Sequence, residues 1–124
     1  MKLYIAVLDE FPDYMVPTLV AHAVLGAHLN FMADAEILDI FDEERAEHLK
    51  NYNLWLSQSF KKCVVRVNQR EFDRIAALSN VYLAHEKHTL EGRTSCAVVC
   101  PMPDDSLPNV LRFAKLWKPK HDVS

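Results

Sequence analysis

Residues 2–29 read KLYIAVLDEFPDYMVPTLVAHAVLGAHL. The run Leu3–Leu8 is apolar at every position, which is typical of a strand buried on both faces of a sheet. An acidic turn follows, and Pro17 fits the first turn of a helix over Val16–Leu29, where a missing N–H costs little. Because α/β proteins commonly bind ligands where a strand leads into a helix, this stretch is the first candidate for a site.

The remaining sequence alternates between strand and helix patterns. Residues 32–40 are ambiguous, because Glu36–Ile40 fits either a short strand or an extension of the first helix. The other predicted elements are a helix from its N-cap Asp42 to Gln58, a strand Lys62–Val67, a helix Arg70–Leu78, strands Val81–Ala84 and Ser95–Val99, and a final helix from Asp105 or Ser106 through Trp117.

This order, β-α-α-β-α-β-β-α, predicts one α/β domain over residues 1–124. Helical crossovers favour parallel strand pairs, whereas the short link between the last two strands permits an antiparallel pair. The expected architecture is a three-layer α/β/α sandwich on a mixed four-stranded sheet.

Composition narrows the function classes. Half of the chain is hydrophobic and a quarter is charged, which excludes a disordered protein. The net charge of −3 gives no global attraction for nucleic acid. The chain has only two glycines, too few for a Gly-rich phosphate-binding loop. The charge is nevertheless uneven: residues 34–47 are acidic, and residues 61–74 are basic.

Three cysteines in apolar runs, without a secretory segment, predict a reducing, cytoplasmic location. Cys96 and Cys100 on one strand are about 13 Å apart, too far for a disulfide or a shared metal. We expect no membrane span, because no apolar run approaches about 20 residues.

Four segments carry a resemblance to a known family. They are Lys2–Asp9, Ala21–Ala27, Phe60–Val67 and the strand Thr94–Pro103 with the helix that follows at Leu111–Leu116. In these segments the chain resembles the peptidyl-tRNA hydrolase II superfamily over nearly its whole length. It is more similar to an uncharacterised bacterial branch of that fold than to the active hydrolases.

The resemblance implies a site with altered chemistry. Enzymes of the family hydrolyse the ester between a peptide and tRNA without a metal, using a lysine, a glutamine and a histidine at the start of the first helix. If His22 matches that histidine, Met15 and Leu19 occupy the other two positions, and neither donates a hydrogen bond. The family's Asp-Ala-Gly-Arg-Thr motif places either Glu86 or Leu90 at its aspartate, depending on the register.

The first helix and its turn offer three candidate residues. Thr18 and His22 are one helical turn apart and share a face. His22 is either a general base or ligand-binding group near the positive helix start, or a hydrogen-bonded packing residue. Asp9 is a ligand-binding candidate, unless it caps the helix together with Glu10 and Asp13.

The polar segment after the third strand offers the remaining candidates. His85, Glu86 and His88 form either an acid/base cluster near His22, in which Glu86 is the expected carboxylate, or an exposed loop. Arg93 and Thr94 either bind an anionic group or cap the backbone. A His-x-x-His spacing alone is a weak zinc signal, so we expect no metal and no cofactor.

Two main functions follow, in different classes. One is a domain that binds a small molecule or nucleotide and lacks the usual catalytic set. The other is a peptidyl-tRNA ester hydrolase with a rearranged site using His22 and Glu86, for which tRNA is a weakly supported partner. A third possibility is a partner-binding module that uses the acidic segment 34–47, and we also expect a homodimer through an apolar helix face.

Overall fold

The computed structural model describes residues 1–36, 42–86 and 90–120, without the side chains of residues 34–36. Its strands are β1 (Leu3–Leu8), β2 (Lys62–Val67), β3 (Val81–Glu86), β4 (Arg93–Val99) and β5 (Lys115–Leu116). Its α-helices are α1 (Val16–Glu36), α2 (Glu43–Leu54), α3 (Gln69–Ala76) and α4 (Asn109–Arg112). Shorter turns are the 3-10 segments η1 (Asp13–Met15) and η3 (Asp104–Ser106) and the π-helical segment η2 (Trp55–Ser59).

The strands form one mixed sheet in the order β3-β4-β1-β2-β5. β1 and β2 are parallel, and the other neighbouring pairs are antiparallel. The mixed α/β class is therefore confirmed, whereas the four-stranded sheet was wrong by one edge strand. Because β4 is antiparallel to both of its neighbours, β3 runs in the same direction as β1.

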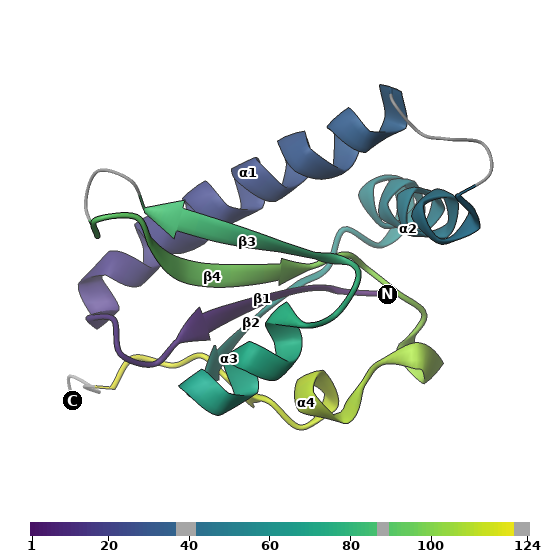
Figure 1. Ribbon diagram of the computed structural model, residues 1–124. Helices are drawn as coiled ribbons and strands as arrows, with labels where there is room; N and C mark the ends of the chain where they lie inside the picture. Colours follow the sequence, from purple (N-terminus) through teal and green to yellow (C-terminus); the bar gives the residue numbers. More distant parts are fainter. Residues whose placement is uncertain (37–41, 87–89, 121–124) are drawn as a thin grey trace.

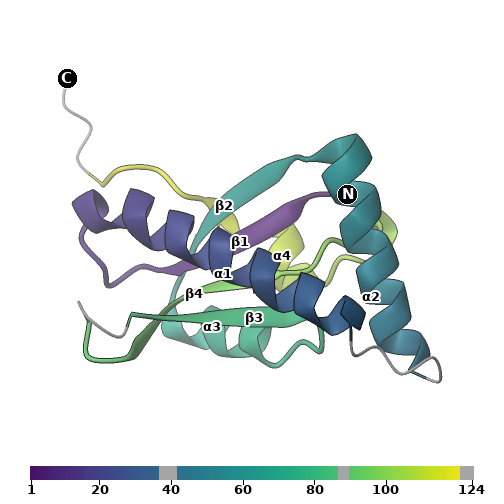
Figure 2. The ribbon, with the colours of Figure 1, turned by 90° about the horizontal axis from the view of Figure 1, so that it is seen from above.

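Helices lie on both sides of this sheet (Figures 1 and 2). α1 and α2 lie on one side, where α1 runs over β3, β4 and β1. α3 and α4 lie on the other side. The first crossover, through α1 and α2, and the second, through α3, thus leave the sheet toward opposite faces.

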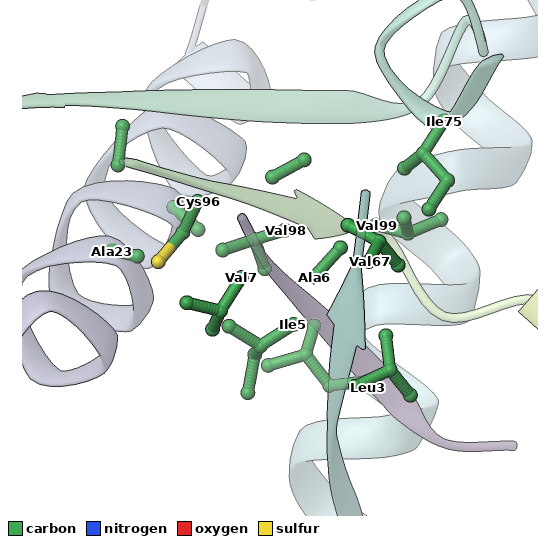
Figure 3. Packing of buried hydrophobic residues seen from close by; sticks show 14 of the residues in the cluster. Leu3, Ile5, Ala6, Val7, Ala23, Val67, Ile75, Cys96, Val98 and Val99 are labelled. Atoms are coloured by element: carbon green, nitrogen blue, oxygen red, sulfur yellow. The ribbon is translucent and has the colours of Figure 1, made fainter. Parts of the chain in front are cut away.

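The hydrophobic core lies on both sides of the sheet, between the strands and the two helical layers, because alternate residues of each strand face opposite layers. On the α1 side Val7 pairs with Cys96, whose side chain lies beside Ala23 (Figure 3). On the α3 side Ile75 is buried near Val99. β1 is buried at all positions except the half-buried Tyr4, as its apolar sequence predicted.

A close contact sets the position of α1 over β3. A Cβ atom on Gly26 would lie 2.4 Å from the hydroxyl oxygen of Tyr82, with two ring atoms at 2.9 Å. Only glycine fits at this position without movement of the ring. The contact brings the helix directly against the edge strand and so positions His22, one turn earlier in α1.

Most element boundaries agree with the sequence prediction. The Asp42 carboxylate accepts a hydrogen bond from the Arg45 N–H and caps α2 as expected. Asn68 and Glu71 form a capping box, so α3 begins one residue before the predicted start. α1 continues to Glu36, and the rest of the alternative strand Glu36–Ile40 lies outside the described residues.

The predicted final helix was wrong. The segment instead forms η3, the four-residue α4 and the edge strand β5. Leu107 has ψ 124° and Pro108 has ψ 153°, both extended. Proline disfavours a helical conformation in the residue before it, so a helix cannot run through this point.

α1 is unusually apolar for a helix with an exposed side. By length and composition the helical stretch Asp13–Ala33 is able to cross a membrane, contrary to our expectation of no such segment. The core helix of a soluble protein passes the same test. Val20, Val24 and Phe31 pack against the core, whereas Leu25 and Leu29 are each 62% exposed, so only part of the apolar surface of α1 faces outward.

Candidate active site

One end of the sheet collects most of the predicted site residues. β1 and β3 run in the same direction, so Asp9 and Glu86 lie at the same end as the first residue of β4, Arg93. The first turns of α1 lie at this end as well (Figure 1). Sequence segments that are far apart therefore meet here, as the strand-turn-helix pattern suggested.

His22 and Glu86 are in direct contact. His22 Nδ1 lies 3.2 Å from Glu86 Oε2. The contact follows from the alternation along β3: Tyr82 and Glu86 both face α1, where they meet Gly26 and His22, which are one helical turn apart. His22 is hydrogen-bonded, as its structural alternative supposed, but it is not buried, because its side chain is 59% exposed.

The Glu86 carboxylate is buried, with a side chain only 7% exposed. A buried carboxylate needs hydrogen-bond donors, and the imidazole of His22 supplies the shortest contact. Ser95 Oγ lies at the hydrogen-bond limit, 3.5 Å from Glu86 Oε1. Ser95 is available because a bulge opposite Ala84 and His85 leaves it out of the strand register.

This arrangement orients the imidazole ring. Glu86 binds Nδ1, which fixes the ring and leaves Nε2 as the nitrogen that can exchange a proton with a ligand or water. A histidine oriented by a carboxylate and open to solvent is the usual geometry of a general base. Thr18 is exposed one turn earlier in α1, on the same side as His22.

Arg93 is opposite Glu86 in the strand register, but its side chain is engaged by the β1–α1 turn and lines the same cavity as Phe72 and Thr94. Its guanidinium forms an ion pair with the carboxylate of Glu10 and lies 5.2 Å from the centre of the Phe11 ring. Glu10 therefore does not cap the helix, and the η1 N-cap, Pro12, has no side-chain cap bond. The ion pair connects β4 to the turn that opens α1.

His85 and Thr94 are separated from this group. Thr94 Oγ1 and His85 Nδ1 share a hydrogen bond of 3.1 Å. Thr94 lines a cavity of about 430 Å³ together with Phe72 and Leu83, which places it on the α3 side of the sheet. The prediction of one cluster from His85 to Thr94 was therefore wrong, because alternate residues point to opposite faces. His88 lies outside the described residues.

Asp9 lies in a different part of the same end of the sheet. It lines a cavity of about 530 Å³ with Arg66 and Asn68, beside the carboxyl ends of the parallel pair β1 and β2. Its backbone oxygen accepts a hydrogen bond of 2.8 Å from the Lys120 ammonium group. Cations from β2 and the C-terminal segment, Arg66, Lys115 and Lys118, also line this cavity.

Asp13 holds the C-terminal segment through contacts that no sequence pattern predicts. Asp13 accepts a hydrogen bond of 2.5 Å from the Lys120 backbone N–H and pairs with Arg66 at 3.3 Å. These contacts hold the pKa of Asp13 below its ordinary 3.8, the Lys120 N–H contributing most. Asp13 thus fastens the C-terminal segment to the turn instead of capping α1.

Two further observations bear on the chemistry. Among the described residues no three His, Cys, Asp or Glu side chains come together as metal ligands. Burial raises the pKa of the Cys96 and Cys100 thiols to about 12, so neither is a nucleophile at neutral pH. Comparison with protein-family models and with curated proteins finds no match to this chain.

Proposed function

We propose that this protein is a metal-independent ester hydrolase in which His22 is the general base and Glu86 orients it. The contact between His22 Nδ1 and Glu86 Oε2, with an exposed ring on a buried carboxylate, carries this proposal. The resemblance to the peptidyl-tRNA hydrolase II superfamily suggests the substrate class, an acyl group esterified to a ribose hydroxyl. The family relationship is itself part of the proposal.

The reaction needs one proton carrier. His22 Nε2 removes a proton from water as the oxygen attacks the ester carbonyl, and the imidazolium then returns the proton to the leaving alkoxide. Glu86 accepts a hydrogen bond from Nδ1–H and stabilises the imidazolium that forms. Products are the free acid and the alcohol, so no other reactant is required.

The hydrogen-bond donors that stabilise negative charge on the carbonyl oxygen must come from positions other than those used by the related enzymes. Leu19 is 2% exposed and belongs to the core, and Met15 packs against the core, so neither supplies a polar group to the site. The proposed donor is Thr18, which is exposed on the same side of α1 as His22, and Arg93 can donate only if it leaves Glu10. Loss of an oxyanion donor typically costs about 3–4 kcal/mol, so we expect slow turnover.

The test is hydrolysis of a model peptidyl-tRNA and of a small aminoacyl ester by the purified chain. We expect His22→Ala to lower kcat by about 100-fold or more, the range for a general base. His85→Ala is the matched control, because His85 lies on the adjacent position of the same strand as Glu86 but faces the opposite layer. Turnover that survives His22→Ala would remove His22 from the mechanism.

A second candidate is binding of a small molecule or nucleotide without catalysis. The apolar Met15 and Leu19 favour it, since they replace polar groups that the family uses for chemistry. A panel of nucleotides and small acyl esters screened by thermal shift would identify such a ligand. A shift that disappears in His22→Ala and Glu86→Ala, combined with no hydrolysis, would establish binding in place of hydrolysis.

A further inference from the structure

The two parallel strands of the sheet lead to opposite faces at their carboxyl ends. β1 continues into α1 on one face, and the neighbouring β2 continues into α3 on the other (Figure 1). Where the connections of adjacent parallel strands diverge in this way, a crevice opens beyond the strand ends, and α/β proteins commonly bind ligands there. The cavity of about 530 Å³ lined by Asp9, Arg66 and Asn68 lies at this position.

This cavity is separate from the contact between His22 and Glu86. Glu86 ends β3, and the sheet order places β3 three strand positions from β2. At a spacing of about 4.8 Å between strands, the ends of these two strands are roughly 14 Å apart. Within the described part of the chain, no residue that lines the cavity belongs to α1, β3 or β4. A ligand in this cavity therefore occupies a different site from that of the proposed hydrolysis.

Three cationic side chains line the cavity, Arg66 from β2, Lys115 from β5 and Lys118 from the C-terminal segment. The Arg66 side chain is only 17% exposed, and it is held by the Asp13 carboxylate at 3.3 Å and by the Lys118 carbonyl. Both contacts use Nη2, so Nη1 and Nε have no hydrogen-bond partner among the described residues. A fixed guanidinium with N–H groups to donate, next to two lysines, is an arrangement suited to a phosphate group.

The first turn of α3 adds backbone donors beside these cations. A helix leaves four N–H groups without partners at its start, and the capping box satisfies those of Asn68 and Glu71. The N–H groups of Gln69 and Arg70 take no part in the capping box. Because the start of a helix is also the positive end of its dipole, these two donors favour an anion.

The cavity also offers groups that a bare phosphate ion would not need. Phe113 and Leu116 line it, and they are two of the six large apolar side chains that are exposed in the described part of the chain. Asp9 and Glu71 add carboxylate oxygens, which repel a phosphate but accept hydrogen bonds from hydroxyl groups. The cavity therefore combines partners for a phosphate, for hydroxyl groups and for a flat apolar ring.

We propose that this cavity binds a nucleoside monophosphate. Its phosphate lies between Arg66, the two lysines and the start of α3, its ribose hydroxyls donate to the carboxylates, and its base stacks on Phe113. The cavity volume falls within the range of about 300–1,000 Å³ that is usual for small-molecule sites. A strand of RNA fits less well, because its successive phosphates would meet two carboxylates on a chain of net charge −3.

Isothermal titration calorimetry with adenosine 5′-monophosphate tests the proposal on the complete chain. We expect Lys115→Ala/Lys118→Ala to weaken the affinity by about tenfold or more, and Phe113→Ala by about fivefold or more. Lys61→Ala is the matched control, because Lys61 is an exposed lysine at the opposite end of β2, just before the strand begins. This variant should bind the nucleotide as the wild type does.

The same titrations give the results that would overturn the proposal. One is absence of binding by the 5′-monophosphates of adenosine, guanosine, cytidine and uridine at millimolar concentrations. Others are an affinity that the lysine substitutions leave unchanged, and an equal affinity for inorganic phosphate, which would make the cavity a simple anion site. His22→Ala should bind as tightly as the wild type, and loss of binding in this variant would assign the nucleotide to the proposed hydrolytic site instead.

An NMR titration of the wild type gives a second measurement that does not depend on a variant folding. On addition of adenosine 5′-monophosphate we expect the amide signals of Gln69 and Arg70 to shift, whereas those of His22 and Glu86 stay in place. Shifts confined to α1 and β3 would contradict the proposed site. Because binding and hydrolysis are measured separately, failure of either proposal leaves the other open to its own test.

Discussion

At the scale of single residues, the contact between His22 and Glu86 combines an exposed ring with a buried charge. A carboxylate in the core is stabilised only when its oxygens are hydrogen-bonded, and His22 provides the closest donor. The contact therefore has a structural role whether or not the protein is an enzyme. This role can be measured separately from activity.

We predict that His22→Ala lowers the free energy of unfolding by about 1–3 kcal/mol, because it leaves the Glu86 carboxylate buried with Ser95 as a distant partner. The double variant His22→Ala/Glu86→Gln should be more stable than His22→Ala at pH 7, since an unpaired amide costs less to bury than an unpaired carboxylate. Urea unfolding measures both. Equal stability of the two variants would show that the unpaired Glu86 carboxylate does not destabilise the fold, and the contact would then have no structural role.

The sequence suggested this contact as one of two alternatives, without deciding whether the two side chains come within reach, and was insufficient to predict its surroundings. The alternation of β3 and the helical spacing of α1 bring Glu86 and His22 together. His85 and Thr94 were expected beside them but face α3, because a segment that is polar throughout gives no sign of which residues point to which side. The bulge that brings Ser95 toward Glu86 leaves no signal in composition at all.

At the scale of elements, the packing of α1 on β3 depends on a glycine. Gly26 is in the helix interior, where glycine is less favourable than alanine by about 1 kcal/mol. The Tyr82 ring occupies the space that a Cβ atom would need. Close approach has therefore outweighed helix propensity at this position.

We predict that Gly26→Ala destabilises the fold by about 1–3 kcal/mol, the usual cost of overpacking, in spite of its better helix propensity. In a Tyr82→Ala background the same substitution should be neutral or stabilising, because the ring is gone. Thermal unfolding of the four proteins in this cycle gives the coupling between the two sites. Additive effects would mean that Tyr82 moves aside freely.

The C-terminal segment is a second element, and the contacts of Asp13 with Lys120 and Arg66 are part of what holds it. Since these contacts lower the pKa of Asp13 from its ordinary 3.8, the stability they provide is present above that value and is lost as the pH falls through the lower folded pKa. We predict that Asp13→Asn is less stable than the wild type at pH 7. The difference in urea midpoint should shrink as the pH is brought well below 3.8; a constant difference would assign the effect to packing.

Helices and strands were predicted correctly where a single sequence pattern was present and incorrectly where two patterns disagreed. Strands β1 and β2 have apolar residues in the pattern of a buried sheet, and α3 has a capping box. The final segment has helical spacing of Leu107, Leu111 and Ala114, but Pro108 interrupts it. The spacing alone predicts one long helix, whereas Pro108 limits the segment to the short α4 and the edge strand β5.

At the scale of the whole molecule, the two edges of the sheet have opposite properties. β3 is six residues long and carries no charge from Val81 to Ala84, whereas β5 is short and is followed by a segment that folds back onto β2. The Trp117 N–H donates to the Val64 carbonyl at 2.9 Å, and the Arg66 guanidinium lies 5.1 Å from the Trp117 ring. The C-terminal segment thus covers the outer edge of β2, which would otherwise be as open as β3.

Removal of residues 115–124 tests this role of the C-terminal segment. We predict a loss of roughly 2 kcal/mol or more in the free energy of unfolding, since Trp117 no longer covers β2, together with aggregation through the newly exposed edge Lys62–Val67.

Leu116→Ser in the complete chain is the control. The Leu116 side chain is 60% exposed and its backbone pairing with Val65 remains, so the substitution should change the free energy of unfolding by no more than about 0.5 kcal/mol. Urea unfolding and light scattering measure the two effects, and a truncated chain with unchanged midpoint and mass would show that β2 needs no cover.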